Sequence, residues 1–330
     1  MAADTLRLAF WDVRLSRDGP GILLRDILRE RGDDLVAARA VIAQVAPDIL
    51  VLSGIDTDAE GRTLAAFADF LGGYPNQLTK VGNEGRLSGL DLNGDGRRNT
   101  AQDTLGFGNF PGNGGLAVLA REGMALSLEQ DFTGLLWRDV PEAMLAPGVL
   151  AEGAEAIQPL SSTGHWVVRA GPLALLIHGA TPPIFDGPED RNGRRNHDEA
   201  ALWSHVLDGH LGQPITGPFA LMAKVNADPV DGEARNGAIQ RLLADPRLQD
   251  PKPTSLGAVQ EATPGHRGDP ALDTANWDEP APGNLRADYI LPSVDLDVLD
   301  AGVMWPAPGS EVAQLGNHGL VWVDVRLPAP

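Results

Sequence analysis

Polar residues that could bind a charged ligand follow a short apolar stretch that begins at Phe219. The stretch contains Lys224 and leads into Asn226, Asp228 and Pro229. An apolar run that gives way to short polar residues and proline is typical of a buried strand entering a turn, and ligands of open α/β sheets bind at such strand ends. Side chains alternate along a strand, so Lys224 and Asn226 are expected on one face. Because lysine is rarely buried without a partner, the simplest expectation is that Lys224 extends past the strand end into solvent.

A second group of oxygen-bearing side chains lies in a loop rich in glycine and asparagine. Oxygen donors occupy the first, third and fifth positions of the segment DLNGDG that starts at Asp91, and glycine occupies the sixth, which is the spacing of an EF-hand calcium loop. The twelfth position holds Gln102 instead of glutamate, and no convincing helices flank the loop. The sequence therefore predicts an isolated structural calcium site, with an ion-free turn as the alternative. The candidate ligands are Asp91, Asn93, Asp95, Arg97 and Asp103.

The composition limits the classes of partner. The chain has 330 residues and a formal net charge of −19. Because proteins bind duplex nucleic acid largely by neutralising phosphates with Lys and Arg, this charge argues against a nucleic-acid-binding function, although a small basic pocket remains compatible with it. The absence of cysteine excludes disulfides and thiol chemistry, and no apolar stretch is long enough to span a membrane.

The N-terminal residues bear on location. We expect no signal peptide in this sequence. Ala2, Ala3 and Asp4 would naturally follow a small-residue cleavage site. We therefore expect an exported protein, periplasmic or extracellular, with a cytoplasmic location left open.

The order of apolar segments predicts an α/β fold. The chain is expected to open with a strand, a helix, a strand and a helix, over 6–13, 35–46, 49–52 and 61–71. Further strands are expected over 115–120, 166–170, 173–178, 219–225, 287–291, 296–303 and 320–326. Further helices are expected over 197–211, with Asn196 as the N-cap, and over 237–244. Without repeats or a linker, residues 1–330 are expected to form one domain, with long loops that must be functional or pinned. These loops span 72–114, 181–196 and 252–283.

Short segments of distinctive composition occur in a fixed order along the chain. They are FWDV at 10–13, LSGID at 52–56, TPP at 181–183, NADP at 226–229, DYILP at 288–292 and NHGLVWVDV at 317–325. The most specific stretch is Thr181–Trp203, and FGNFPGNGG at 107–115 and LDTANW at 272–277 add to it. Through these segments nearly the whole chain resembles the endonuclease/exonuclease/phosphatase superfamily, and most closely its secreted bacterial members. The resemblance implies a four-layer α/β sandwich, two stacked mixed β-sheets flanked by helices, with the site at the strand ends.

The resemblance also implies metal-assisted phosphoester hydrolysis, in which carboxylates hold a cation and a base activates water. Several positions that carry this chemistry in the family hold other residue types here. They are Asp12 in place of Asn, Gly54 in place of the metal-binding Glu, Gly179 in place of His, Lys224 in place of the Asp of Asp-x-Asn, and Asn317 in place of the C-terminal Asp. His178 lies one residue before the expected histidine, and such a shift moves a side chain to the other face of a strand. The retained positions are Asn226, Asp288 and His318.

These substitutions favour a degenerate family member that keeps the fold and has little or no hydrolase activity. Mg²⁺ relies on one or two carboxylates, so the loss of one weakens its site severely, and a lysine nearby repels the cation. In this hypothesis the Lys224 ammonium occupies the vacated cation position and pairs with Asp12. Lys224, Asn226 and His318 would then bind a small phosphorylated ligand, or the pocket would be purely structural.

The alternative is an active metal-dependent phosphodiesterase or phosphatase with a rearranged site. It would use His178 or His318 together with relocated carboxylates. It requires Asp12, Asp228 and Asp288 to converge within metal-ligand distance of one another.

A basic cluster in the loop before the helix expected at 197–211 has two explanations. Its members are Arg191, Arg194 and Arg195. They could hold a phosphate through bidentate hydrogen bonds. They could also pin the loop by pairing with nearby acids, as arginines often do. Those acids are Asp186, Glu189 and Asp190.

Overall fold

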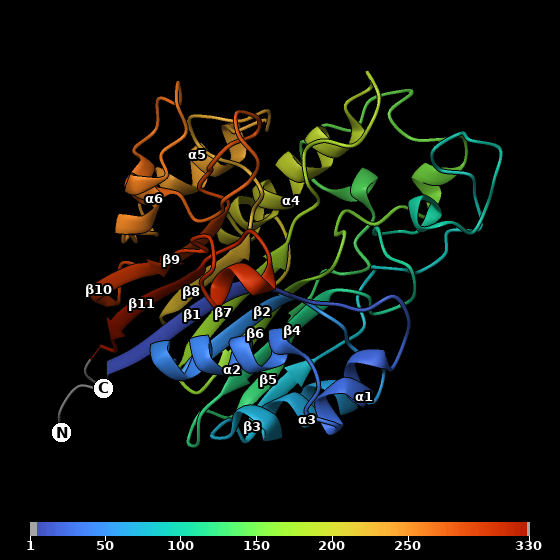
Figure 1. Cartoon of the computed structure of the whole chain (residues 1–330). Helices are drawn as coiled ribbons and strands as arrows, with labels where there is room; N and C mark the ends of the chain where they lie inside the picture. Colours follow the sequence, from blue (N-terminus) through green and yellow to red (C-terminus); the bar gives the residue numbers. More distant parts are fainter. Residues whose placement is uncertain (1–4, 329–330) are drawn as a thin grey trace.

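Two β-sheets lie face to face in the computed structural model, which describes residues 5–328 of the chain. Helices pack against the outer face of each sheet (Figure 1). The architecture is therefore the four-layer α/β sandwich that the resemblance implied. That residues 1–330 form one domain stays a prediction.

The first sheet contains six strands within the described residues. They are β1 (Thr5–Leu15), β2 (Ile49–Ile55), β3 (Asn76–Thr79), β4 (Gly115–Ala120), β10 (Asp297–Met304) and β11 (Leu320–Arg326). Their order across the sheet is β10-β11-β1-β2-β4-β3. Strands β1 and β2 are parallel and the other neighbours are antiparallel, so the sheet is mixed as expected.

The second sheet contains five strands within the same residues. They are β5 (Leu126–Asp131), β6 (His165–Ala170), β7 (Leu173–Gly179), β8 (Phe219–Lys224) and β9 (Asp288–Pro292), in that order across the sheet. Strands β7 and β8 are parallel, and the other neighbours are antiparallel. The residues that end β8 and begin β9 therefore lie side by side, with Lys224 opposite Asp288.

The helices divide between the two outer faces. On the first sheet lie α1 (Ile22–Leu28), α2 (Asp33–Val45) and α3 (Arg62–Leu71). On the second sheet lie α4 (Arg191–Leu207) and α5 (Gly237–Leu243), and α6 (Leu256–Gln260) packs against a 3₁₀ turn. The 3₁₀ turns span Ala101–Asp103, Trp137–Asp139, Ala154–Ala156, Pro270–Leu272 and Val312–Leu315. Among residues 5–328 we find no helix long and apolar enough to cross a bilayer. The residues on which the prediction of export depends, 2–4, lie outside the described part.

Alternation along the strands produces the layers. In β1, Leu8 and Phe10 face the other sheet, whereas Trp11 and Val13 face the helices. Both faces of this strand are apolar because it is covered on both sides. The same alternation decides which polar residues at the strand ends point between the sheets.

Helix α4 begins earlier than expected. It starts at Arg191, not near 197, so Asn196 is not its N-cap and lies inside the helix. Asn196 is fully buried, and its side-chain amide donates to the carbonyl oxygens of Thr181 at 2.8 Å and Val225 at 2.7 Å. The first turns of α4 bury polar side chains against loop carbonyls, so the apolar periodicity that marks a helix begins only later in the sequence.

The long loops are shorter or more ordered than expected. The loop at 72–114 contains β3, the loop at 252–283 contains α6, and the loop at 181–196 ends where α4 begins. The first of these loops is pinned by Asn83, whose side-chain amide donates to the carbonyl oxygens of Thr133 at 2.6 Å and Ser161 at 2.9 Å. In Figure 1 this loop, in cyan, lies beside the green loops that precede β6.

Glu84 is a buried acid within this pinned loop. Its side chain is 1% exposed, Oε1 accepts a hydrogen bond from Gly82 N at 3.2 Å, and Oε2 has no partner within the described residues. Burial raises the pKa of Glu84 to about 7, because a buried carboxylate loses hydration that its single backbone contact does not replace.

We predict that Glu84→Gln changes the pH dependence of the free energy of unfolding. The Glu84 pKa is near 4.5 in the unfolded chain and about 7 in the folded protein. The unfolded chain therefore loses this proton first, and the free energy of unfolding of wild type decreases as pH rises from about 4.5 to about 7. The loss from this group amounts to about 3 kcal/mol. Urea unfolding of both proteins across that pH window should show that the free energy of unfolding of the variant increases relative to that of wild type as pH rises. Glu122→Gln, at an exposed site, is the control and should follow wild type; parallel profiles for all three proteins would contradict the prediction.

Candidate functional site

An ion pair between the two sheets forms the centre of the site. Lys224 is the last residue of β8, and its ammonium donates to Asp12 Oδ2 on β1 at 2.6 Å. The two side chains are 18% and 13% exposed. They meet because Asp12 continues the inner face of Leu8 and Phe10, and Lys224 continues the inner face of Met222. Lys224 therefore does not extend into solvent, and the predicted pairing with Asp12 is confirmed.

A histidine–carboxylate pair lies beside this ion pair. His318 precedes β11 and Asp288 begins β9, and their Nδ1 and Oδ2 atoms are 2.7 Å apart. The same Asp288 oxygen accepts a hydrogen bond from the Thr274 hydroxyl at 3.1 Å. His318 Nε2 lies 3.8 Å from Asp12 Oδ2, so the two pairs form one network of alternating charge.

The charges in this network hold each other in their ionised forms. Burial alone would raise the pKa of Asp12, but the charges of Lys224 and His318 and the hydrogen bond from Lys224 lower it overall. Burial alone would lower the pKa of His318, but the charge and hydrogen bond of Asp288 and the charge of Asp12 raise it overall. The surroundings thus favour the carboxylate form of Asp12 and the protonated form of His318 more than burial alone would allow.

The two asparagines predicted for the site use their side chains to fix backbone. Asn226 has a φ of 54°, and its side-chain amide donates to Ala180 O at 2.8 Å. Asn317 donates through its side-chain amide to Asn276 O at 2.6 Å. Both residues line the same cavity as Lys224 and His318, but neither is hydrogen-bonded to them.

His178 does not join the other predicted site residues. It is fully buried on the opposite face of β7, where its Nδ1 accepts a hydrogen bond from Trp203 Nε1 at 2.8 Å. Its ring stacks on that of His165, with centroids 4.5 Å apart. The strand register explains this, because Ile177 and Gly179 face the other sheet and His178 between them cannot.

Glycine at 54 and 179 leaves no side chain at the two positions where the resemblance implied a metal-binding Glu and a His in other family members. A Cβ at Gly54 would lie 2.2 Å from Asp12 Oδ1, and the φ of Gly54 is +73°, which strains any other residue. A Cβ at Gly179 would lie 3.1 Å from Ser53 Oγ. Asp12 and Ser53 thus fill space that larger side chains at these positions would need.

Of the three acids that a rearranged metal site would need, Asp12 and Asp288 lie on either side of His318, and Asp228 is held by backbone N–H groups. Asp228 accepts hydrogen bonds from the backbone N–H groups of Val230 at 2.7 Å and Arg286 at 2.8 Å, and Asp288 is held by His318. Within residues 5–328 there is no cluster of three His, Cys, Asp or Glu side chains placed to hold a metal ion. Each of these three acids has a hydrogen-bonding partner in the protein.

The network opens into a cavity of about 800 Å³. Arg14, Phe185 and Trp277 contribute to its walls, and the edge of the Trp277 ring faces His318, with centroids 5.1 Å apart and planes at 89°. Sequence reasoning missed these three residues as site residues. Arg14 follows the register shift of β1 with a φ of 46°, and no periodic pattern reveals such a position in advance.

The predicted calcium loop forms a series of side-chain-capped turns. Asp91 Oδ1 accepts from Gly94 N at 2.8 Å, and its Oδ2 accepts from Gly96 N at 2.8 Å. Asp103 is buried and accepts from Leu92 N at 2.9 Å, so it fastens the loop. The remaining side chains, Asn93, Asp95 and Arg97, are exposed at the tip.

Comparisons with known proteins agree with this architecture. A family model described as the Endonuclease/Exonuclease/phosphatase family matches residues 20–318. A search of curated protein sequences gave no match.

Several solved structures share the fold. An endonuclease/exonuclease/phosphatase from Beutenbergia cavernae is 18% identical with a TM-score of 0.54, covering 98% of this chain and 72% of its own. A family protein from Bacteroides thetaiotaomicron is 12% identical with a TM-score of 0.53, covering 100% of both chains. A mannosyl-6-phosphatase from the same organism is 14% identical with a TM-score of 0.51, covering 97% of this chain and 99% of its own.

We predict a strong energetic coupling between Lys224 and Asp12. Removal of either charge leaves the other without its partner between the sheets. A double-mutant cycle with Lys224→Met and Asp12→Asn, measured by urea unfolding at neutral pH, should give a coupling of about 1 to 3 kcal/mol. Because the pKa of Asp12 is lowered from 3.8, the coupling is present above that pH and fades as acidification protonates Asp12.

The matched control is the more exposed ion pair of Lys80 and Asp131, whose side chains are 53% and 20% exposed. A cycle with Lys80→Met and Asp131→Asn should give a coupling below about 1 kcal/mol. Equal couplings in the two cycles would show that the inter-sheet position adds nothing.

Proposed function

The chain belongs to the endonuclease/exonuclease/phosphatase family, and from this premise we propose that it binds a small phosphorylated ligand without metal-dependent hydrolysis. The observation that carries the proposal is the 2.6 Å contact between Lys224 and Asp12. An ammonium group there supplies the positive charge that a cation would otherwise bring. In the same region the described residues lack a carboxylate set for Mg²⁺ or Mn²⁺.

The donors around the cavity support an anionic ligand. The Lys224 ammonium has three N–H donors, and Asp12 takes one of them. His318 uses Nδ1 for Asp288, which leaves its Nε2 toward the cavity. Arg14 also lines the cavity and forms no ion pair within residues 5–328. A phosphate group would gain charge-assisted hydrogen bonds from these three side chains.

The size of the cavity and the net charge of the chain indicate the class of ligand. The cavity of about 800 Å³ accommodates a small organic phosphate. The net charge of −19 disfavours a polyanion such as duplex nucleic acid, which needs many phosphate contacts at once. One protein with this fold is a mannosyl-6-phosphatase, so the fold is compatible with a small phosphorylated compound.

An active phosphoesterase is the second candidate, and the intact His318–Asp288 pair is the observation that favours it. Asp288 fixes the orientation of the imidazole and, with Asp12, raises the pKa of His318. A protonated histidine in this place could donate a proton to a leaving oxygen. This candidate lacks a carboxylate placed to activate water, since Asp12 is held by Lys224.

We predict that the protein binds inorganic phosphate and that Lys224→Gln weakens this binding about tenfold or more, because a charge-assisted hydrogen bond is lost. Calorimetry measures the affinity. Lys252→Gln, at an exposed lysine, is the matched control and should bind as wild type does. Unchanged affinity in Lys224→Gln would exclude this pocket as the phosphate site.

The same proteins should show no turnover of bis(4-nitrophenyl) phosphate or 4-nitrophenyl phosphate with Mg²⁺, Mn²⁺ or Ca²⁺. The reason is the missing carboxylate set. Metal-dependent turnover that disappears in Asp288→Asn would instead establish the second candidate.

We also propose that calcium binds the loop at 91–103 through the side chains at its tip. Asp91, Asn93 and Asp95 belong to consecutive turns, in which Asp95 N donates to Asp91 Oδ1 at 3.2 Å and to Asn93 Oδ1 at 3.3 Å. Hard oxygen donors at this spacing suit Ca²⁺. Asp103 would act indirectly, since both of its oxygens hold Leu92 and Thr100.

We predict that Ca²⁺ raises the midpoint temperature of wild type and not that of Asp95→Ala. An ion that binds only the folded protein stabilises it by about 2.7 kcal/mol at a hundred times its Kd. Differential scanning fluorimetry with and without Ca²⁺ gives the shift, and the exposed Asp69→Ala variant serves as control. A shift that persists in Asp95→Ala would place any bound ion elsewhere.

A further inference from the structure

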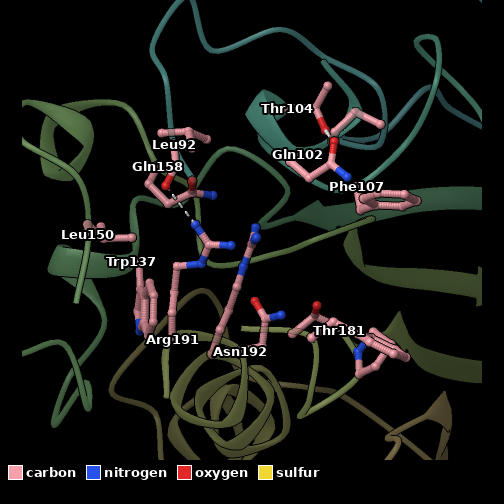
Figure 2. Close-up of a pocket in the computed structure, with 14 residues that line it drawn as sticks. Leu92, Gln102, Thr104, Phe107, Trp137, Leu150, Gln158, Thr181, Arg191 and Asn192 are labelled. Carbon is pink, nitrogen blue, oxygen red and sulfur yellow. Dashed lines mark hydrogen bonds between the residues drawn. The ribbon is translucent and has the colours of Figure 1, made fainter. Parts of the chain in front are cut away.

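A second cavity lies at the first turn of α4, outside the ion-pair network (Figure 2). Its volume is about 550 Å³. We call it the α4 cavity and define it by Arg191 and Arg195 of α4, Gln102 and Phe107 of the 72–114 loop, and Trp137 and Gln158 of the segment before β6. Phe107, Pro182 and Phe185 line both this cavity and the larger one, so the two cavities adjoin.

The charge of the α4 cavity is entirely positive. Arg191 and Arg195 are the charged residues in its lining, and no Asp or Glu of the described residues contributes to it. In a chain with a net charge of −19, a cavity with two guanidinium groups and no carboxylate is unexpected. Neither arginine forms an ion pair within residues 5–328, so the predicted pairing with acids of the preceding loop is wrong for both.

Arg195 is held rigidly and keeps one donor group free. Arg195 is 8% exposed. Its Nε donates to Leu160 O at 2.7 Å, and its Nη2 donates to Leu105 O at 2.7 Å. Its Nη1 makes no hydrogen bond within the described residues. A fixed guanidinium with a free N–H edge toward a cavity is preorganised for an anion.

Arg191 adds a second, more mobile donor. Its Nη1 donates to Leu92 O at 3.1 Å, as the dashed line in Figure 2 shows, and its other nitrogens make no hydrogen bond within the described residues. Burial, and to a smaller extent the nearby charge of Arg191, lower the pKa of Arg195 to about 10, although the charge of Glu199 opposes both effects. The Glu199 carboxylate is already occupied by the backbone N–H groups of Ser162 and Thr181. An anion between the two arginines would therefore reduce the repulsion between their positive charges, because no carboxylate of the described residues is hydrogen-bonded to either of them.

The rest of the lining suits the organic part of a ligand. Phe107 gives a flat apolar surface and is 69% exposed although it is a large aromatic residue, whereas Trp137 borders the cavity but is fully buried. Gln102, Thr104 and Asn192 supply neutral hydrogen-bonding groups around the same space. An apolar wall with a few polar groups and a charged anchor is the usual composition of a small-molecule site.

We propose that the α4 cavity is a binding site for a small organic anion, a ring compound whose carboxylate or phosphate group lies between Arg191 and Arg195. The ring packs against Phe107, and ring substituents contact the neutral polar residues. This site adjoins the Lys224 pocket but has its own charged groups, and it does not depend on the function proposed for that pocket.

The test uses one tryptophan in each cavity as a reporter. Trp137 lines the α4 cavity and Trp277 lines the Lys224 pocket. The full-length protein labelled with 5-fluorotryptophan gives ¹⁹F signals that Trp137→Phe and Trp277→Phe assign. Phenyl phosphate, phenylacetate and inorganic phosphate are titrated separately. We expect phenyl phosphate to shift the Trp137 signal saturably, with an affinity about ten- to a hundredfold lower in Arg191→Gln, because a charge-assisted contact is lost.

The control variant is Arg194→Gln, which removes an arginine of the same helix turn that does not line the cavity. It should bind phenyl phosphate as wild type does. Circular dichroism and thermal unfolding check that each variant is folded, and Arg191→Lys, which keeps the charge, should restore part of the affinity.

The three probes separate the possible anions. Shifts of Trp137 with both phenyl phosphate and phenylacetate support a general organic-anion site, and a shift with phenyl phosphate alone identifies an organic phosphate. Inorganic phosphate with the same affinity as phenyl phosphate would overturn the role of the ring. A Trp137 signal that stays in place, or shifts equally in Arg191→Gln, would overturn the site. A shift confined to Trp277 would also overturn it while supporting the ligand proposed for the Lys224 pocket.

Discussion

Apolar packing between the inner faces of the two sheets fixes the positions of Asp12 and Lys224 in the Lys224 pocket. Leu8 and Phe10 of β1 and Met222 of β8 are held in one apolar layer. Because side chains alternate along a strand, the next inward positions are Asp12 and Lys224, and they must lie between the sheets. Two charges between the sheets are stable only as a pair, because desolvation of a lone charge costs roughly several kcal/mol. The ion pair therefore follows from the core rather than from local sequence.

Each of the four polar side chains in this network has a partner of opposite charge or a hydrogen-bonding partner within the network. Lys224 faces Asp12, His318 faces Asp288, and the two carboxylates hold the two cations at short distances. A metal-dependent site has the opposite character, because its carboxylates remain unpaired until a cation enters. Conversion of this pocket into such a site would need more than the removal of Lys224. Gly54 has a positive φ, and a side chain there would collide with Asp12, so carboxylate and backbone would both have to move.

Alternation and order along the chain carry much of what could be predicted. They give the α/β class, many of the strands, and the warning that His178 points away from Gly179, whereas the two stacked sheets and the pairing of Lys224 with Asp12 were expected only from the family resemblance. Alternation and order fail where polar side chains are buried. Arg195 and Asn196 are inside the protein and bond to backbone carbonyls, so the start of α4 has the polar composition of a loop. Edge strands such as β5, with mostly exposed residues, likewise lack the apolar pattern of a core strand.

The acidic surface and the cationic cavities are compatible because the two act over different distances. At physiological salt, charges separated by more than about 8 Å of solvent are largely screened. The net charge of −19 repels a long polyanion that must lie along the surface. A small anion that enters a cavity contacts Arg191 or Lys224 directly, in surroundings of lower dielectric where each contact is stronger. The net charge therefore disfavours large anionic partners but not small ones, and local arginines and lysines decide where a small anion binds.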